Sequence, residues 1–176
     1  MLFSLITHFV SKLPPWKGLA KYYDVDQDNT SEDLVLLMEH IDIMTARKYI
    51  EVFGVIEICN VRIIVYQMLS LLKDLIKIDC YHGRLNLNNI HFDSQFNVKI
   101  TDYGLMRIFD KEAQFTTEEG SRFDIFCLGI WVLKILGKIN LDQGSDHSID
   151  VFLENLEALK YWYHLVSKFL LRLLIF

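Results

Sequence analysis

The stretch "CYHGRLNLNNIHFDSQFNVKITDYGL", residues 80–105, is the most informative part of this 176-residue chain. A polar loop, "HGRLNLN", leads into two short extended runs, "NNIHF" and "NVKI". The residues "DSQF" between them favour a turn, so the two runs are predicted to pair as a small hairpin. The stretch ends in "TDYG", whose Asp and Gly are typical of a further turn.

Two apolar segments on either side of this stretch are predicted to be helices. Between residues 61 and 76 the apolar positions recur at steps of three and four, which places them on one helical face. These positions are Ile64, Met68, Leu71, Leu72 and Leu75. From Ser121 to Leu136 the sequence is apolar nearly all round, which indicates a helix buried on more than one side. Ser121 or a neighbour is predicted to cap its start.

The outer parts of the chain complete an α+β, mainly helical pattern. "GLAKYYDV" (18–25) and "EDLVLLMEHI" (32–41) are predicted strands that flank the polar loop "DQDNTS" as a hairpin. Residues 150–176 are predicted to be helical. The apolar segment 161–176 is too short to span a bilayer, and a core helix is favoured over the alternative of a membrane-surface helix.

Charge and cysteine content exclude several classes of function. The net charge of −5 and the pI of about 5.6 argue against a nucleic-acid partner, which requires a clustered basic face. The three cysteines, Cys59, Cys80 and Cys127, are an odd number and lack metal-ligand spacing. We therefore expect a reduced, cytoplasmic chain with no membrane span and no zinc site.

Several motifs together resemble the protein-kinase family. "HGRLNLNNI" is similar to the catalytic loop H-R-D-L-x-x-x-N, and "TDYGL" resembles the metal-binding D-F-G turn. "RFDIFCLGI" resembles the start of the central helix of the kinase large lobe, and "LVLLMEHI" resembles the strand that enters the interlobe hinge. The order and spacing of these pieces also agree with the family.

The resemblance implies a kinase-like large lobe with a truncated small-lobe remnant. Residues 1–41 would be the remnant, with the end of the small-lobe helix, two strands and the hinge. Residues 42–176 would be the helical large lobe, incomplete at its C-terminus. The implied nucleotide contacts are Met38, Glu39 and Ile41 in the hinge and His91 as the floor under adenine. The implied metal ligands are Asn89 and Asp102, for which the structural alternatives are a strand-start cap and a turn aspartate.

The stretch that resembles the catalytic loop departs from the family motif at the positions of its arginine and its catalytic aspartate. His82 and Asn89 match the motif, but Gly83 replaces its arginine and Arg84 replaces its catalytic aspartate. That aspartate accepts the proton of the substrate hydroxyl, whereas a guanidinium is donor-only and stays protonated. The chain also contains no G-x-G-x-x-G loop and no V-A-I-K-like strand. Asp124 resembles the aspartate that holds the catalytic-loop backbone.

The sequence therefore predicts a pseudokinase, or a fragment of one, rather than an enzyme. It would act as a binding or scaffolding module for a protein partner, with no required cofactor and at most weak binding of ATP with Mg²⁺. The shared absences also resemble the kinase-like portion of TBC-domain-containing kinase-like proteins. The alternative is a serine/threonine kinase whose small lobe is missing through truncation or a gene-model error.

Two further expectations follow from the resemblance. Arg84 is hypothesised to pair with Asp102 in the former active cleft and to substitute for a metal ion, and the alternative is a solvent-facing Arg84. The short small-lobe remnant is predicted to leave apolar side chains uncovered, such as Tyr23, Val35 and Leu37, and so to favour association.

Overall fold

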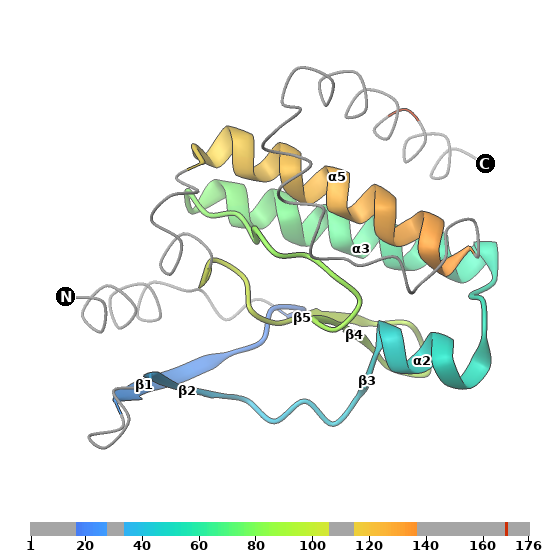
Figure 1. The fold of residues 1–176 in the computed structure, drawn as a ribbon, viewed down its shortest axis with the longest axis horizontal. Helices are drawn as coiled ribbons and strands as arrows, with labels where there is room; N and C mark the ends of the chain where they lie inside the picture. The colour runs from blue at the N-terminus through green and yellow to red at the C-terminus, as the bar shows by residue number, and fades with distance from the viewer. Residues whose placement is uncertain (1–16, 28–33, 106–114, 137–167, 169–176) are drawn as a thin grey trace.

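Two long helices form the framework of the computed structural model, which describes residues 17–27, 34–105, 115–136 and 168 (Figure 1). Helix α3 (Ile58–Lys77) and helix α5 (Thr117–Ile135) lie side by side above a small sheet. The prediction of α3 from its apolar spacing is confirmed. Helix α5 starts four residues before Ser121, so the predicted cap is wrong. Thr116 caps the helix instead, because its hydroxyl and the Glu119 carboxylate satisfy each other's backbone N–H groups.

The sheet beneath the helices has three antiparallel strands in the order β3-β4-β5. Strands β4 (Ile90–Phe92) and β5 (Val98–Ile100) form the predicted hairpin. Strand β3 (Met44–Thr45) pairs with the outer edge of β4 and leads into helix α2 (Ala46–Phe53). Neither β3 nor α2 was predicted individually, because two strand residues carry no periodic signal.

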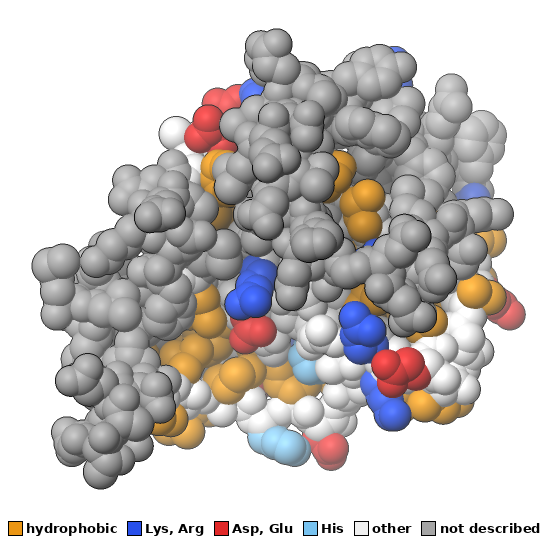
Figure 2. Space-filling model, viewed as in Figure 1, with side chains coloured by type: hydrophobic (Ala, Val, Ile, Leu, Met, Phe, Trp, Pro, Cys, Tyr) orange, Lys and Arg blue, Asp and Glu red, His pale blue; other side chains and the backbone are white. Residues whose placement is uncertain are grey.

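A separate two-stranded sheet joins β1 (Tyr22–Gln27) to β2 (Leu34–Met38), as the sequence predicted. Tyr23, Val35 and Leu37 are more than half exposed, in agreement with the expectation for this hairpin. Figure 2 shows hydrophobic side chains at the surface over this part of the molecule. Their effect on association stays a prediction.

The predicted helical tail lies outside the described residues except for Lys168, which is helical. None of the described helices combines the length and the hydropathy that a membrane-spanning helix requires.

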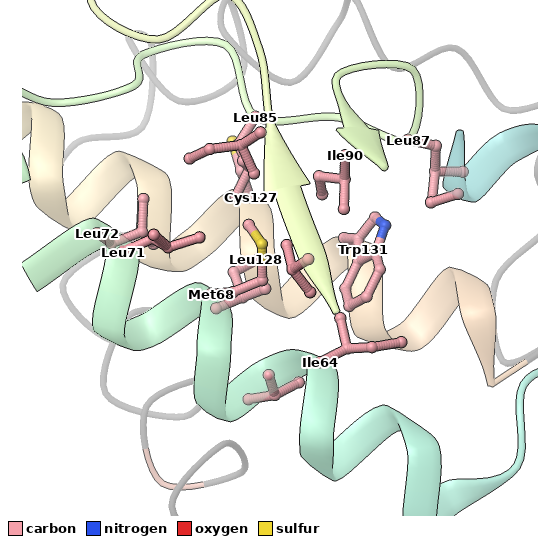
Figure 3. Close-up of a cluster of buried hydrophobic side chains, with 14 of the residues drawn as sticks. Ile64, Met68, Leu71, Leu72, Leu85, Leu87, Ile90, Cys127, Leu128 and Trp131 are labelled. Atoms are coloured by element: carbon pink, nitrogen blue, oxygen red, sulfur yellow. The ribbon is translucent and has the colours of Figure 1, made fainter. Parts of the chain in front are cut away.

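One buried cluster joins the helices, the sheet and the loop that precedes β4 (Figure 3). Met68 of α3, Leu128 of α5 and Ile90 of β4 are fully buried. Leu85 and Leu87 add the loop itself to this cluster. Apolar packing against the helices and the sheet therefore holds the loop at residues 80–89 and fixes the position of its backbone.

Asp124 of α5 holds the same loop by hydrogen bonds. Its carboxylate accepts from the backbone N–H of His82 at 2.7 Å and of Gly83 at 2.8 Å. This confirms the role predicted for Asp124. Gly83 has a φ of 79°, a conformation that favours glycine, so the exchange of arginine for glycine also suits the local backbone.

Burial raises the pKa of Asp124 and lowers the pKa of His82. It raises the pKa of Asp124 to about 7, although the two N–H donors oppose the shift. It lowers the pKa of His82 to about 4, opposed by backbone groups of His82 and Thr101. Both groups are therefore more neutral in the folded chain than they would be exposed to water.

Gly120→Ala tests the approach of α5 to the loop. A Cβ at position 120 would lie 2.3 Å from Cγ of the buried Tyr81 ring. Alanine in a helix gains about 1 kcal/mol over glycine, but overpacking of a core costs about 1–3 kcal/mol. Because the ring and the helix are both fixed, we expect a net loss of roughly 1 kcal/mol in the free energy of unfolding, measured with urea. The neighbouring Ser121→Ala should be nearly neutral, and a gain in stability for Gly120→Ala would contradict the packing.

Asp124→Asn tests the loop anchor. A carboxyl group has two oxygens that can accept, even when one is protonated, whereas an amide has one, so one buried N–H loses its partner at a cost of roughly 1–3 kcal/mol. The exposed Glu118→Gln is the matched control.

The stability that is lost in Asp124→Asn should also depend on pH. Because the pKa of Asp124 is higher in the folded chain, the folded state holds more protons than the unfolded state between about pH 4 and 7. Asp124 therefore contributes most to the free energy of unfolding below pH 4, and this contribution falls as the pH rises through about 7. The difference in Tm between wild type and Asp124→Asn should shrink over that range. A constant or growing difference would disprove the shift.

Candidate functional site

The four residues predicted to contact a nucleotide line one open pocket. Its volume is about 440 Å³, and its lining residues are Met38, Glu39, His40, Ile41, His91 and Thr101. The pocket lies between the segment that follows β2 and the sheet of β3, β4 and β5. The structure thus brings the hinge candidates and the floor candidate together, as the resemblance implied.

Glu39 ties the hinge segment to the sheet. Its Oε1 accepts from the backbone N–H of Lys21 and from Nζ of Lys99, each at 2.7 Å. Burial opposes ionisation of Glu39, but the hydrogen bonds from Lys99 and Lys21 outweigh it and lower the pKa of the carboxyl. Both side chains are partly exposed, so the pair positions the hinge more than it stabilises the fold.

His91 occupies the middle of β4, opposite Thr45 on one side and Lys99 on the other. Burial lowers its pKa, while a backbone interaction with Ile43 and the charge of Asp102 oppose the shift. Its imidazole, which lines the pocket, is therefore mainly neutral at pH 7 and has a flat aromatic face. Such a face is suited to stacking on a planar ligand.

Lys99 and Thr101 belong to this region but were not predicted from the sequence. The signal that could have found Lys99 is its register, since it lies directly opposite His91 in the predicted hairpin. Cross-strand partners point to the same face of a sheet. Thr101 follows β5 directly and donates its backbone N–H to the Asn89 carbonyl at 3.0 Å.

Arg84 does not pair with Asp102, so the hypothesis of a buried ion pair is wrong. The Arg84 side chain is exposed, and no ion pair joins it to Asp102 or to any other residue that the structure describes. The Arg84 carbonyl accepts from the side-chain amides of Asn86 at 2.9 Å and Asn89 at 2.7 Å, and its N–H donates to Nδ1 of His82 at 3.2 Å.

Asn89, one of the two predicted metal ligands, stabilises the loop at residues 80–89 by hydrogen bonds. Besides donating to Arg84, it accepts the Asn86 N–H on Oδ1 at 2.9 Å. One acceptor position of that oxygen is therefore occupied, although an amide oxygen has two. Asp102 is exposed, with a φ of 60°, and its carboxylate has no hydrogen-bond partner among the described residues.

Tyr103 and His82 serve packing, as the sequence predicted. The Tyr103 ring stacks on Tyr22 with centroids 4.9 Å apart, and its hydroxyl donates to the Ala20 carbonyl at 2.7 Å. Burial raises the pKa of both tyrosines, so both remain phenols at any physiological pH. His82, which belongs to the loop at residues 80–89, is fully buried. Tyr103 thus connects the β1–β2 hairpin to the turn that carries Asp102.

Comparison with known proteins points to kinases. No family model matches the chain. It is 30% identical to the cysteine-rich receptor-like protein kinase 10 of Oryza sativa subsp. japonica in an alignment of 91 residues. That alignment covers 40% of this chain and 14% of the rice protein.

The structural comparison covers more of the chain. The crystal structure of Rad53 1–466 in complex with AMP-PNP matches 98% of this chain with a TM-score of 0.69 and 20% sequence identity. The chain spans about half of that protein, since 49% of it is matched. At this identity the likeness concerns the fold, and it agrees with the motifs of residues 80–105. The chain has a protein-kinase-like fold.

Proposed function

We propose that this chain is a catalytically inactive kinase-like domain that acts by binding a protein partner. The observation that carries the proposal is Arg84. The position that the catalytic carboxylate takes in the family is held here by a guanidinium on an ordered backbone. A guanidinium cannot accept the proton of a substrate hydroxyl.

The loop architecture supports a binding role. Asp124, Asn86 and Asn89 fix the loop through hydrogen bonds to backbone groups. None of these contacts needs a substrate or a metal ion. A loop fixed in this way can present a constant surface, with Arg84 and Asn88 exposed on it, to a partner protein.

The alternative is a serine/threonine kinase whose small lobe is not part of this sequence. The chain spans only part of the proteins that it resembles, so a nucleotide lid and a strand lysine can belong to residues outside it. Residue 84, however, would still be an arginine. We therefore favour the inactive domain.

A nucleotide can enter the pocket without catalysis. A volume of about 440 Å³ is within the range of small-molecule sites, about 300–1,000 Å³. Hinge recognition of adenine uses backbone groups, which do not depend on side-chain identity. Affinity is expected to be weak, because the sequence supplies no phosphate-binding glycine loop.

Phosphoryl transfer should be indistinguishable from background. The assay is radiolabelled phosphate transfer from ATP to a generic protein acceptor, with the partly exposed Asp74→Ala as a control for Asp102→Ala. Without a base, a strand lysine and a lid, positioning and electrostatics fall short of what kinase catalysis needs. Transfer that disappears in Asp102→Ala and persists in Asp74→Ala would refute the proposal.

Mg-ATP should stabilise the chain only slightly. A ligand at a concentration equal to its Kd adds about 0.4 kcal/mol to the free energy of unfolding. Because weak affinity places micromolar ATP below the Kd, the stabilisation should be smaller still, and the thermal-shift curve should not move measurably. Substituting His91→Asp, which removes the aromatic face, should then change nothing at that concentration. A rise of several degrees in wild type that is lost in His91→Asp would show tight binding in the pocket.

A further inference from the structure

The β1–β2 hairpin has one face against the core and one face open to solvent. Tyr22 and Val25 of β1 are buried, and Leu36 and Met38 of β2 pack against the core cluster. The alternate residues of both strands point the other way. Figure 1 shows the hairpin extending away from α3 and α5, and no other described strand pairs with it. The described part of the chain therefore leaves one face of this sheet uncovered.

The cross-strand register sorts the open face into two rows. Asp24 lies opposite Leu37, and Asp26 lies opposite Val35. Because cross-strand partners share a face, the aspartates form an acidic row along β1 and the aliphatic side chains form an apolar row along β2. Val35 is 54% exposed and Leu37 is 58% exposed, and both aspartates are exposed. A register irregularity just before Asp24 leaves Tyr23 exposed beside this face.

The negative charge of Asp24 is available to an occupant of the face. Its Oδ1 accepts the N–H of the next residue, Val25, at 2.8 Å, and no ion pair joins Asp24 to a basic side chain of the described residues. The ammonium of the nearby Lys21 lies over the Tyr23 ring, 5.0 Å from its centroid. The open face therefore presents negative charge next to apolar surface, and a complementary occupant is both basic and apolar.

The spacing of the two rows suits an α-helix that lies along the strands. Neighbouring strands are about 4.8 Å apart, and residues two apart on a strand repeat at about 6.7 Å. On a helix, residues four apart repeat at about 6 Å along the axis, and the row three residues on lies beside them. Such a helix can place aliphatic side chains on Val35 and Leu37 and lysines or arginines on the acidic row.

A second copy of this chain is a poor occupant of the same face. In a two-fold contact, the acidic row of one copy would face either the acidic row or the apolar row of the other. The first arrangement brings like charges together, and the second buries carboxylates against aliphatic side chains. The net charge of −5 adds to the repulsion between copies. A basic amphipathic helix meets neither penalty.

We propose that the open face of the β1–β2 hairpin, formed by Asp24, Asp26, Val35 and Leu37, binds an amphipathic helix of a partner protein. The helix carries a row of lysines or arginines beside a row of aliphatic residues. This inference rests on the proposed function, because it names the surface and the partner chemistry through which an inactive domain acts. The face shares no residue with the 440 Å³ pocket.

The test measures binding of a labelled synthetic peptide to the full chain by fluorescence anisotropy, without ATP. The peptide is a helix in which a leucine row and an adjoining lysine row each repeat every four residues, and a control peptide has glutamate in place of each lysine. We expect saturable binding of the lysine peptide at micromolar concentration and binding of the glutamate peptide about tenfold weaker or worse. Asp24→Lys should weaken the lysine peptide and strengthen the glutamate peptide.

Two matched valines separate the face from the overall negative charge of the chain. Val35 is 54% exposed, Val52 of α2 is 53% exposed, and replacing either by serine leaves the charge unchanged. Val35→Ser should weaken the lysine peptide by about fivefold or more, because apolar contact is lost, whereas Val52→Ser should not change it. If Val35→Ser does not fold, Leu37→Thr takes its place, since threonine suits a strand.

The same measurements can overturn the proposal. Absence of saturable binding, or equal weakening in Val35→Ser and Val52→Ser, would remove the face as a binding site. A dimer in sedimentation that is lost in Val35→Ser would assign the face to a second copy. Tighter binding of a peptide of residues 161–176, in which Lys168 and Arg172 are four apart, would assign it to this chain itself. None of these outcomes bears on the proposed inactivity, which the phosphoryl-transfer assay tests separately.

Discussion

The two hydrogen bonds from the backbone of His82 and Gly83 to Asp124 are the constraint on which the rest of the site depends. They join the loop at residues 80–89 to the most buried helix of the described chain. The backbone is thereby fixed at residue 83, and the side chain of the next residue, Arg84, is exposed. The same anchor places Leu85 and Leu87 in the core, so the loop is held by polar contacts on one side and apolar contacts on the other.

The hydrogen bonds that hold the loop at residues 80–89 do not involve the side chain at position 84. Asn86 and Asn89 bond to the Arg84 carbonyl and to each other, and Tyr103 links the following turn to the β1–β2 hairpin. All of these contacts use backbone groups or packing. The identity of the side chain at position 84 does not enter them, which is why an arginine there leaves the loop intact. An inactive binding domain is consistent with such an arrangement.

Patterns among neighbouring residues correctly predicted the elements that depend on interactions close in the sequence. The apolar spacing of α3 and the turn residues between β4 and β5 identified both correctly, because periodicity and turn chemistry are properties of neighbouring residues. The start of α5 was misplaced, since Thr116 and Glu119 formed a capping box outside the apolar run. Strand β3 was missed because its pairing with β4 joins residues far apart in the chain.

The residue types at the candidate site follow from the sequence: an arginine where the resemblance to kinases places a carboxylate, a histidine in the strand that lines the pocket, and an aspartate in the long apolar helix. Which of these side chains meet depends on the tertiary structure. It left Arg84 exposed and unpaired with Asp102, and it joined Glu39 to Lys99 across 60 positions. Such contacts depend on how the helices and the sheet pack, and no local pattern encodes that packing.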